Sequence, residues 1–250
     1  MGHPADWESL PNVQRVKEVM PLSIWDNWTQ NLDSIYSYES FLRAVSKWPA
    51  FCGETYEPMS YDLDQTCKRE LATLFTHIEH NYPKNAGTGT YHARGPLGLK
   101  GEEMYKAFSA DFFEGINREN VLANDPGRVK TDAYTSLSSA IWLYMRSHQA
   151  PSAHSIASGF YKPNASDLAA GHKATFGSTM ILLSPDACGG WSESALSNRI
   201  QERYNTHLVE IGLEPESDTG CARMYADFSW SGSQNKMIYF DTNWSAPNNA

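Results

Sequence analysis

The sequence has no long apolar run and few basic residues. Its longest apolar stretches, 140–145 and 180–183, fall far short of the ~20 residues that a bilayer-spanning helix needs. The 29 aspartates and glutamates outnumber the 20 lysines and arginines, which gives a formal net charge of -9 at pH 7. Nucleic acids and anionic membranes both favour a basic face, because binding there releases counterions. We therefore expect neither as a partner, and we expect a monomer with a neutral ligand.

Cysteine is scarce, and its spacing excludes the common metal and redox motifs. The four cysteines form no CxxC and no zinc-type pattern. Their order suggests a near pair, Cys52 with Cys67, and a far pair, Cys188 with Cys221, while the other connectivities stay open. The first residues, MGHPADWESLP, lack the basic and apolar regions of a signal peptide, so a secreted form would already have lost its signal.

Signals for β-structure are sparse, and 236–240 is the best strand candidate. The chain shows no internal repeat and no linker-like change of composition. With 250 residues, 41 % of them hydrophobic, it is long enough to bury a sizeable core. We therefore expect a single domain over 1–250.

Helical periodicity, by contrast, recurs along the chain. In residues 66–80 an apolar stripe at helical spacing follows a cap at Asp64 or Thr66. The stripe consists of Leu71, Leu74, Phe75 and Ile78. Further helices are predicted over 9–19, 37–47, 102–113, 132–146 and 193–211. The sequence therefore predicts a mainly α fold with long connections.

Two histidines lie near the end of the predicted helix 66–80. His77 and His80 are three residues apart, so they share a helix face and offer two nitrogens to a metal. They do not match HExxH, in which the histidines are four apart with a glutamate between them. No third ligand follows from the spacing, so we expect neither a metal nor another cofactor. The simpler interpretation is a polar helix end, where histidines lie near the negative pole of the helix dipole.

An ordered series of motifs runs along most of the chain. The motifs are YSYESFLRAVSKWPAFCGE (36–54), TCKRELATLFTHI (66–78), YHARGPLGL (91–99), NDPGRV (124–129), FYKPNASDLAAG (160–171), FGSTM (176–180) and NRI (198–200). In this order they resemble the family 19 glycoside hydrolases, particularly the bacterial chitinases. The resemblance fades only at the two ends of the chain, so it concerns most of the sequence.

The resemblance implies a mainly helical, lysozyme-like bilobal domain with a central chitin-binding cleft and little β structure. It implies an N-terminal extension over 1–35, a family core over 36–228 and a C-terminal segment over 229–250. The family is commonly secreted and disulfide-bonded. This favours an extracellular location and the two cysteine pairs suggested by their order.

The position of the catalytic acid departs from the family. Inverting glycosidases use one carboxylic acid to protonate the leaving oxygen and a second carboxylate to activate water. In the family, the acid is the glutamate that ends the helix equivalent to 66–80, and its position here is Asn81. An amide has no titratable proton to give. Glu79 is two residues away, which is ~200° around the helix, so we expect it to face the wrong way.

The catalytic base is also missing from its expected place. The family carries it on a long loop after this helix, whereas the interval here is only NYPKNAGTGT, residues 81–90, without Asp or Glu. The serine associated with holding the catalytic water corresponds to Lys100. The Asn-Tyr-Asn-Tyr run that lines the sugar subsites reads Glu102-Glu103-Met104-Tyr105, and the Asn-Gly-Gly element with a glutamate before cysteine reads Ser184-Pro185-Asp186-Ala187-Cys188. Each lost general acid or base forfeits a factor of ~10² to 10⁴ in rate.

Scaffold residues of the family are nevertheless retained. They are Arg94, Gly95, Asp125, Pro126, Phe176, Gly177 and Arg199. We expect Arg94 and Arg199 to hold the two lobes together rather than contact sugar, since a buried arginine is normally paired. Exposed aromatic residues such as Trp48, Tyr91, Trp191 and Trp230 are candidates for stacking on sugar rings. The candidate binding-cleft residues are His77, His80, Asn81, Tyr91, Arg94, Lys100, Met104, Ser184 and Arg199.

Two functions follow from this interpretation. The first is a chitinase-like protein that lacks the catalytic acid and base and binds chitin or a related glycan weakly, or has been recruited to another partner. The second is an active endo-chitinase that hydrolyses β-1,4-linked N-acetylglucosamine polymers by inversion. The second requires a different alignment at Asn81 or replacement groups, for which Glu102 and Glu103 are the candidates.

Overall fold

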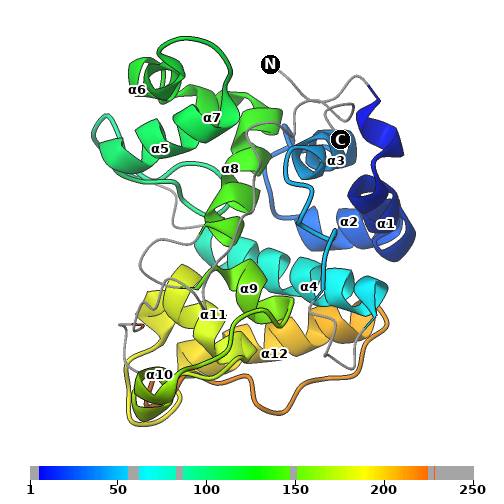
Figure 1. Ribbon diagram of the computed structural model, residues 1–250, viewed down its shortest axis with the longest axis vertical. Helices are drawn as coiled ribbons and strands as arrows, with labels where there is room; N and C mark the ends of the chain where they lie inside the picture. Colours follow the sequence, from blue (N-terminus) through cyan, green and yellow to red (C-terminus); the bar gives the residue numbers. More distant parts are fainter. Residues whose placement is uncertain (1–5, 56–61, 83–86, 147–150, 225–227, 229–250) are drawn as a thin grey trace. The chain divides into compact units, whose positions relative to one another are not determined.

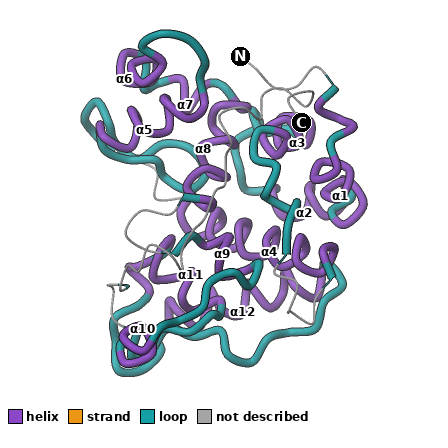
Figure 2. Tube along the Cα trace, in the orientation of Figure 1, coloured by secondary structure: helices purple, strands orange, loops and turns teal. Residues whose placement is uncertain are grey.

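The structure is a computed structural model that describes residues 6–55, 62–82, 87–146, 151–224 and 228. Helices and loops make up the described chain (Figures 1 and 2). Within these residues, β pairing is limited to one isolated antiparallel bridge between Arg94 and Leu99. The prediction of a mainly α fold is therefore confirmed. The strand candidate at 236–240 lies outside the described residues.

The helices follow one another with loops between them. They are α1 (Pro11–Val19), α2 (Leu22–Thr29), α3 (Tyr38–Ser46), α4 (Leu63–Asn81), α5 (Glu102–Phe112), α6 (Val121–Asn124), α7 (Arg128–Thr131), α8 (Ala133–Met145), α9 (Ala153–Ala157), α10 (Ala165–Ala169), α11 (Phe176–Leu183) and α12 (Ala195–Glu210). Short 3-10 turns occur at Trp7–Ser9, Arg118–Asn120 and Pro185–Ala187. None of the described helices is long and apolar enough to cross a membrane.

The helix predicted over 66–80 is real but begins earlier than expected. Asp62 caps it: its Oδ1 accepts a hydrogen bond from the Gln65 backbone N–H at 2.7 Å, and Gln65 Oε1 accepts one from the Asp62 N–H at 3.3 Å. This reciprocal arrangement is a capping box in which glutamine completes the pair. The prediction of a cap at Asp64 or Thr66 was wrong because both residues lie inside the first turns of α4.

The helices that the sequence analysis missed have no clear polar face or are short. All residues from 176 to 181 in α11 are buried, so apolar and polar positions do not alternate with a helical period. In α9 and α10 there are only five residues each, less than two turns. Periodicity needs a longer window than this to identify a helix.

Contacts divide the chain into two compact units. The first takes residues 6–51, 81–82 and 87–143 of the described chain. Its α1 is tied to the end of α3 by Asn12, whose Nδ2 donates to Val45 O at 3.0 Å and to Trp48 O at 3.2 Å. The rings of Trp25 and Phe41 stack with centroids 5.2 Å apart, which joins α2 to α3. This unit therefore has an aromatic core of its own.

The second unit takes residues 52–55, 62–80, 144–146, 151–224 and 228 of the described chain. It is organised around α4, of which every residue from 69 to 78 is buried. Phe176 of α11 stacks on Tyr204 of α12 with centroids 3.9 Å apart. At Gly177, a Cβ would lie 1.8 Å from the backbone oxygen of Gly220, so only glycine allows this approach.

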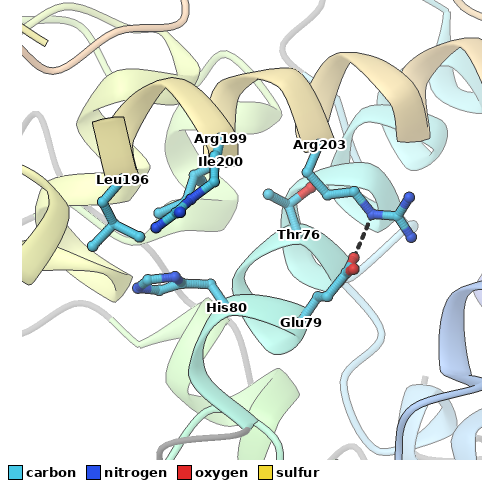
Figure 3. Close-up of a pocket in the computed structure, with 7 residues that line it drawn as sticks. All are labelled: Thr76, Glu79, His80, Leu196, Arg199, Ile200 and Arg203. Atoms are coloured by element: carbon cyan, nitrogen blue, oxygen red, sulfur yellow. Dashed lines mark hydrogen bonds and ion pairs between the residues drawn. The ribbon is translucent and has the colours of Figure 1, made fainter. Parts of the chain in front are cut away.

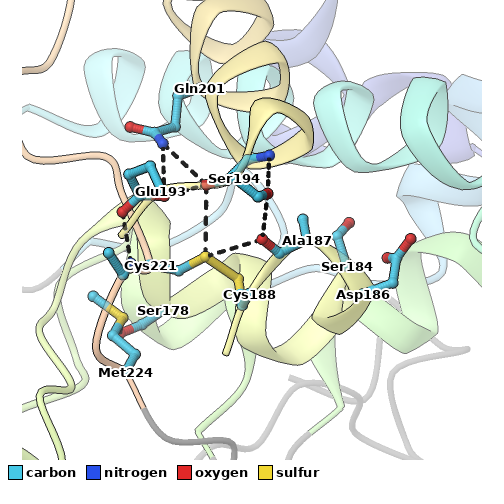
Figure 4. Close-up of a disulfide and its surroundings, with 12 residues drawn as sticks. Ser178, Ser184, Asp186, Ala187, Cys188, Glu193, Ser194, Gln201, Cys221 and Met224 are labelled. Carbon is cyan, nitrogen blue, oxygen red and sulfur yellow. Dashed lines mark hydrogen bonds between the residues drawn. A yellow bond between two sulfur atoms is a disulfide. The ribbon is translucent and has the colours of Figure 1, made fainter. Parts of the chain in front are cut away.

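Both disulfides join the cysteines that the sequence order suggested. Cys52 is bonded to Cys67 and Cys188 to Cys221, with Cα atoms 4.3 and 5.6 Å apart, and no free cysteine remains. Figure 4 shows the second bridge with Glu193 above it. The Glu193 carboxylate accepts a hydrogen bond from the backbone N–H of Ala222 at 2.6 Å, which fixes the segment that carries Cys221.

Candidate functional site

The last two turns of α4 direct their side chains to different environments. Thr76 and His77 are buried, with 1 % and 0 % of their surface exposed. Glu79 and His80 line a pocket on the side of α12, and Asn81 is the half-buried last residue of the helix. Because the helix turns by ~100° per residue, His77 points into the interior while Glu79 and His80 reach the pocket.

His77 lies beneath the surface. Its Nε2 is 2.9 Å from Thr179 Oγ1 and its Nδ1 is 2.8 Å from Ser184 Oγ. The Thr179 hydroxyl donates to Phe176 O at 2.7 Å, so Nε2 carries the proton and Nδ1 accepts from Ser184. Burial, reinforced by the charge of His80, lowers the pKa of His77 to about 3, so the ring is neutral.

This position differs from the expected role of His77 and Ser184 on a binding surface. Both residues are 0 % exposed, so neither reaches a ligand from its present place. Both ring nitrogens of His77 are bonded to hydroxyls, which leaves no open position for a metal. Among the residues that the structure describes, no group of three or more His, Cys, Asp or Glu is arranged to hold a metal ion.

The Glu79 carboxylate pairs with a side chain of α12. Its Oε2 accepts a hydrogen bond from Nε of Arg203 (Figure 3). The same oxygen lies 3.6 Å from Nε2 of His207. Burial lowers the pKa of His207 to about 3, and the charge of Arg203 acts in the same direction, so His207 is neutral. Among the described residues, the Arg203 guanidinium is therefore the charge that matches Glu79.

A pocket of about 260 Å³ lies between the end of α4 and the start of α12. Its lining residues are Thr76, Glu79 and His80 from α4, and Leu196, Arg199, Ile200 and Arg203 from α12. In Figure 3, Arg199 and His80 extend toward one another at one end, and the pair of Glu79 with Arg203 occupies the other. All of these residues belong to the second unit.

Arg199 is not the buried, paired arginine that the sequence predicted. It is exposed, and within the part of the chain that the structure describes its side chain makes no hydrogen bond or ion pair. The carboxylate in the same pocket, Glu79, is bonded to Arg203 instead. Arg199 therefore presents a guanidinium with its donors open.

His80 contacts the segment that follows α11. Its Nε2 lies 3.2 Å from Oδ1 of Asp186, and the two side chains are 8 % and 50 % exposed. Asp186 belongs to the 3-10 turn Pro185–Ala187, which immediately precedes Cys188. The disulfide at Cys188 thus fixes the turn that positions Asp186 against His80.

The first unit contains the retained arginine motif. Arg94 Nη1 donates to Thr90 O at 2.8 Å and to the Tyr105 hydroxyl at 2.9 Å. The Tyr91 hydroxyl donates to Ala123 O at 3.0 Å. At Gly95 φ is +77°, and a Cβ would lie 2.8 Å from Ser139 Oγ. Arg94 therefore braces this turn.

The residues that the sequence analysis assigned to the sugar subsites lie at or just before the start of α5 in the same unit. Lys100, Glu102 and Glu103 are exposed, and Met104 is half-buried. Glu102 forms an ion pair with Lys106 one turn later, at 2.6 Å. Carboxylates in a first helical turn are stabilised by the helix dipole.

The aromatic residues proposed to stack on sugar differ in their exposure to solvent. Trp48 is 0 % exposed and is a core residue, so its predicted availability to a sugar was wrong. Trp191 is 80 % exposed, and Tyr91 is half-buried with its hydroxyl bonded. Trp230 lies outside the described residues. Trp191 is therefore the stacking candidate that the described structure leaves fully accessible.

Sequence reasoning missed a buried charged cluster at the other end of α4. Glu70 and His154 are both 0 % exposed, and Glu70 Oε1 contacts His154 Nδ1. His154 Nε2 is 3.1 Å from Oε1 of Glu54, and the Cys52 N–H donates to Glu70 Oε2 at 2.8 Å. A signal was present: Glu70 lies one helical turn before Leu74, in line with the apolar stripe of α4, and a charge on that face needs a partner.

The charges within this cluster determine its protonation. Burial lowers the pKa of His154, but the neighbouring carboxylates of Glu70 and Glu54 overcome this effect and raise it to about 9. His154 is therefore a buried cation at neutral pH. Its two carboxylate partners satisfy both ring nitrogens, so the cluster has a structural role.

The candidate residues fall into two groups. His80 and Arg199 line one pocket in the second unit, with His77 and Ser184 packed beneath the surface there. Asn81, Tyr91, Arg94, Lys100 and Met104 belong to the first unit, together with Glu102 and Glu103.

Comparison with protein-family models gives one match, over residues 66–221, to the family described as chitinase class I, glycoside hydrolase family 19. An acidic endochitinase of Petunia hybrida is 25 % identical over 237 residues, covering 83 % of this chain and 87 % of the petunia protein. Chitinase 8 of Oryza sativa subsp. japonica is 27 % identical over 237 residues, covering 83 % of this chain and 86 % of the rice protein.

Solved structures show the same fold. A bacterial family 19 chitinase superposes with a TM-score of 0.62 at 21 % identity, covering 81 % of this chain and 100 % of that chain. Family 19 class IV chitinase from Zea mays superposes with a TM-score of 0.58 at 20 % identity, covering 83 % of this chain and 100 % of that chain. At these identities the likeness concerns the fold.

Proposed function

This chain belongs to glycoside hydrolase family 19, the class I chitinases, and from that premise we propose that it binds chitin or a related glycan without hydrolysing it. The observation that carries the proposal is the end of α4. The helix ends at Asn81, which cannot donate a proton as a general acid. The nearest carboxylate on the helix, Glu79, is bonded to Arg203.

The absence of a base in its family position supports the same proposal. Residues 81–90 contain no Asp or Glu, and Lys100 stands where the family has the serine that holds water. Inversion needs a second carboxylate that activates water on the opposite face of the sugar. A chain without either group in place loses both contributions to the rate.

Binding to neutral chitin is expected to be weak. Lys100, Glu102 and Glu103 are exposed charges where the family has groups that contact sugar. Neutral chitin offers them no ion-pair partner, and each charge must stay hydrated to avoid a desolvation cost. Trp191, 80 % exposed, provides an aromatic face for stacking on a sugar ring. We further propose that the protein is a secreted monomer, since two disulfides are typical of oxidising compartments.

The experiment is an assay for reducing sugar released from colloidal chitin and from chitin oligomers. We expect no release by the wild type. We also expect none from Asn81→Glu alone, because restoring the acid does not restore the base. Release by Asn81→Glu at a rate typical of the family would show that the base is present elsewhere.

The second candidate, an inverting endo-chitinase, is favoured by one observation: Glu102 and Glu103 are exposed carboxylates. If wild-type turnover is measured, Glu102→Gln and Glu103→Gln decide between the two sites. Loss of turnover in either variant would assign catalysis to α5. Turnover that survives both would place the catalytic groups outside α5.

Calorimetry measures the affinity for chitin oligomers, which we expect to be weak. For a tetramer of N-acetylglucosamine we expect a dissociation constant no tighter than ~100 μM, or about -5.5 kcal/mol. The triple variant Lys100→Ser, Glu102→Asn, Met104→Asn removes the charges and provides neutral hydrogen-bonding groups. Tighter binding by the triple variant would indicate a surface that has changed away from chitin. Tight wild-type binding that the triple variant weakens would mean that these residues serve the glycan.

A further inference from the structure

The pocket between α4 and α12 carries positive charge that has no counterpart in neutral chitin. We propose that this pocket binds the carboxylate of an acidic sugar residue, with Arg199 as the anchoring side chain. The proposal extends the proposed glycan binding and rests on it only for the choice of a sugar. The electrostatic argument for an anion depends on the pocket alone.

The first step is the balance of charge inside the pocket. Two guanidinium groups, of Arg199 and Arg203, line it with one carboxylate, of Glu79. Glu79 Oε2 accepts a hydrogen bond from Arg203 Nε, and this pair neutralises itself. Arg199, exposed and without an ion pair in the described residues, supplies one unmatched positive charge.

The neighbouring residues do not cancel this charge. His80 points toward Arg199 in Figure 3, and its Nε2 faces Asp186 at 3.2 Å. Asp186 is not among the lining residues, and it is already the partner of His80. A ligand that enters the pocket therefore meets a free cation without a competing carboxylate in the lining, because Glu79 is held by Arg203.

The second step is the shape and chemistry of the pocket. A volume of about 260 Å³ is just below the ~300 Å³ at which ligand pockets for small molecules begin, which suits a single sugar ring. Leu196 and Ile200 supply apolar surface for the face of a ring. The Thr76 hydroxyl donates to Ala72 O at 2.7 Å, so it is not available as a donor to the ligand.

The third step concerns the kind of anion. A guanidinium presents its donors in a planar fork that matches both oxygens of a carboxylate. A neutral N-acetylglucosamine unit offers Arg199 only hydroxyl and amide oxygens, whose hydrogen bonds to a cation are weaker than those of an ion pair. The pocket thus favours a sugar that carries a carboxylate over the uncharged sugar of chitin.

The test uses glucuronate and glucose, which differ only in the oxidation state of C6. Each is titrated into ¹⁵N-labelled protein at low ionic strength, and the amide shifts of α4 and α12 are followed. We expect glucuronate to bind with a dissociation constant on the order of 1 mM and glucose at least tenfold more weakly. Adding salt should weaken glucuronate alone, since exposed charges are screened.

Substitutions identify the anchor. Arg199→Ala should remove the preference for glucuronate, and Arg199→Lys should retain only part of it because the fork is lost. Lys173→Ala is the matched control: Lys173 is an exposed cation of the same unit that pairs with Asp218 at 2.9 Å, far from the lining residues in the sequence. The control should leave the preference unchanged. Unchanged thermal melting of Arg199→Ala would show that its loss of binding is not unfolding.

Three results would overturn the proposal. Equal binding of glucuronate and glucose would show that charge is not recognised, and an unchanged preference in Arg199→Ala would remove the anchor. Inorganic phosphate that displaces glucuronate at equal concentration would indicate a general oxyanion site without a sugar preference. A tetramer of N-acetylglucosamine is titrated in parallel. Binding of glucuronate without binding of the tetramer would support the acidic-sugar site and refute the proposed chitin binding. Binding of the tetramer without glucuronate would refute the acidic-sugar site and leave the chitin binding standing.

Discussion

Two carboxylates of α4, Glu70 and Glu79, show how position along one helix decides the role of a charge. Glu70 is 0 % exposed and forms an ion pair with His154, which is itself fully buried. Glu79 has a side chain that is 36 % exposed and pairs with Arg203 at the edge of a pocket. Both are ion pairs within one compact unit. The pair of Glu70 is enclosed in a core, where an unpaired charge strongly destabilises the fold. The pair of Glu79 is partly exposed, so its loss should change the free energy of unfolding little.

The largest expected effect comes from breaking the buried pair. Glu70→Ala removes the fully buried carboxylate partner of the His154 cation and the acceptor for the Cys52 N–H. We expect a loss of ~3 to 5 kcal/mol in the free energy of unfolding, measured by urea denaturation. Glu79→Ala is the control on the same helix, and its loss should not exceed ~1 kcal/mol. Equal losses in the two variants would contradict the comparison.

The next effect is a dependence of stability on pH. Because the folded pKa of His154 is raised to about 9 from an ordinary value near 6.5, folded protein keeps a proton that unfolded protein releases between these values. The stabilisation is complete below pH 6.5 and is lost as pH rises toward 9, by ~3 kcal/mol in all.

Stability responds to pH in the opposite direction at His77 and His207. Lowered folded pKa values of about 3 at His77 and His207 make stability fall as pH decreases below 6.5, the opposite direction. Urea denaturation between pH 6.5 and 9 therefore reports on His154. The fall in stability should disappear in His154→Ala and persist in Glu79→Gln. A flat profile in the wild type would mean that His154 is neutral in the folded protein.

The smallest effect sharpens the comparison at the pocket. Glu79→Gln leaves an isosteric side chain but frees the charge of Arg203, so the lining gains a second unmatched cation. We expect glucuronate to bind about threefold more tightly, or ~0.7 kcal/mol, as for a partly exposed pair. Glu202→Gln, which changes an exposed carboxylate on α12 that does not line the pocket, should have no such effect. Weaker binding in Glu79→Gln would show that Glu79 itself holds the ligand.

Much of the helical framework could be predicted, because the buried face of an amphipathic helix shows in the sequence as apolar residues at helical spacing. The predicted helix over 132–146 corresponds to Ala133–Met145, and the one over 193–211 to Ala195–Glu210. A helix that is buried on all sides, such as α11, or very short, such as α10, lacks this periodic pattern, so both were missed. The prediction of the two disulfides needed only cysteine order and the family resemblance.

The sequence by itself determined the helical class and the family, since both follow from residue types in order along the chain. Only the tertiary structure decided which charges are matched. It paired Glu70 with His154 across 84 residues and Glu79 with Arg203 across 124. It buried His77 and Ser184 while leaving Arg199 exposed. The energy of a charge depends on its burial and on partners distant in the sequence, and local patterns carry no information about either.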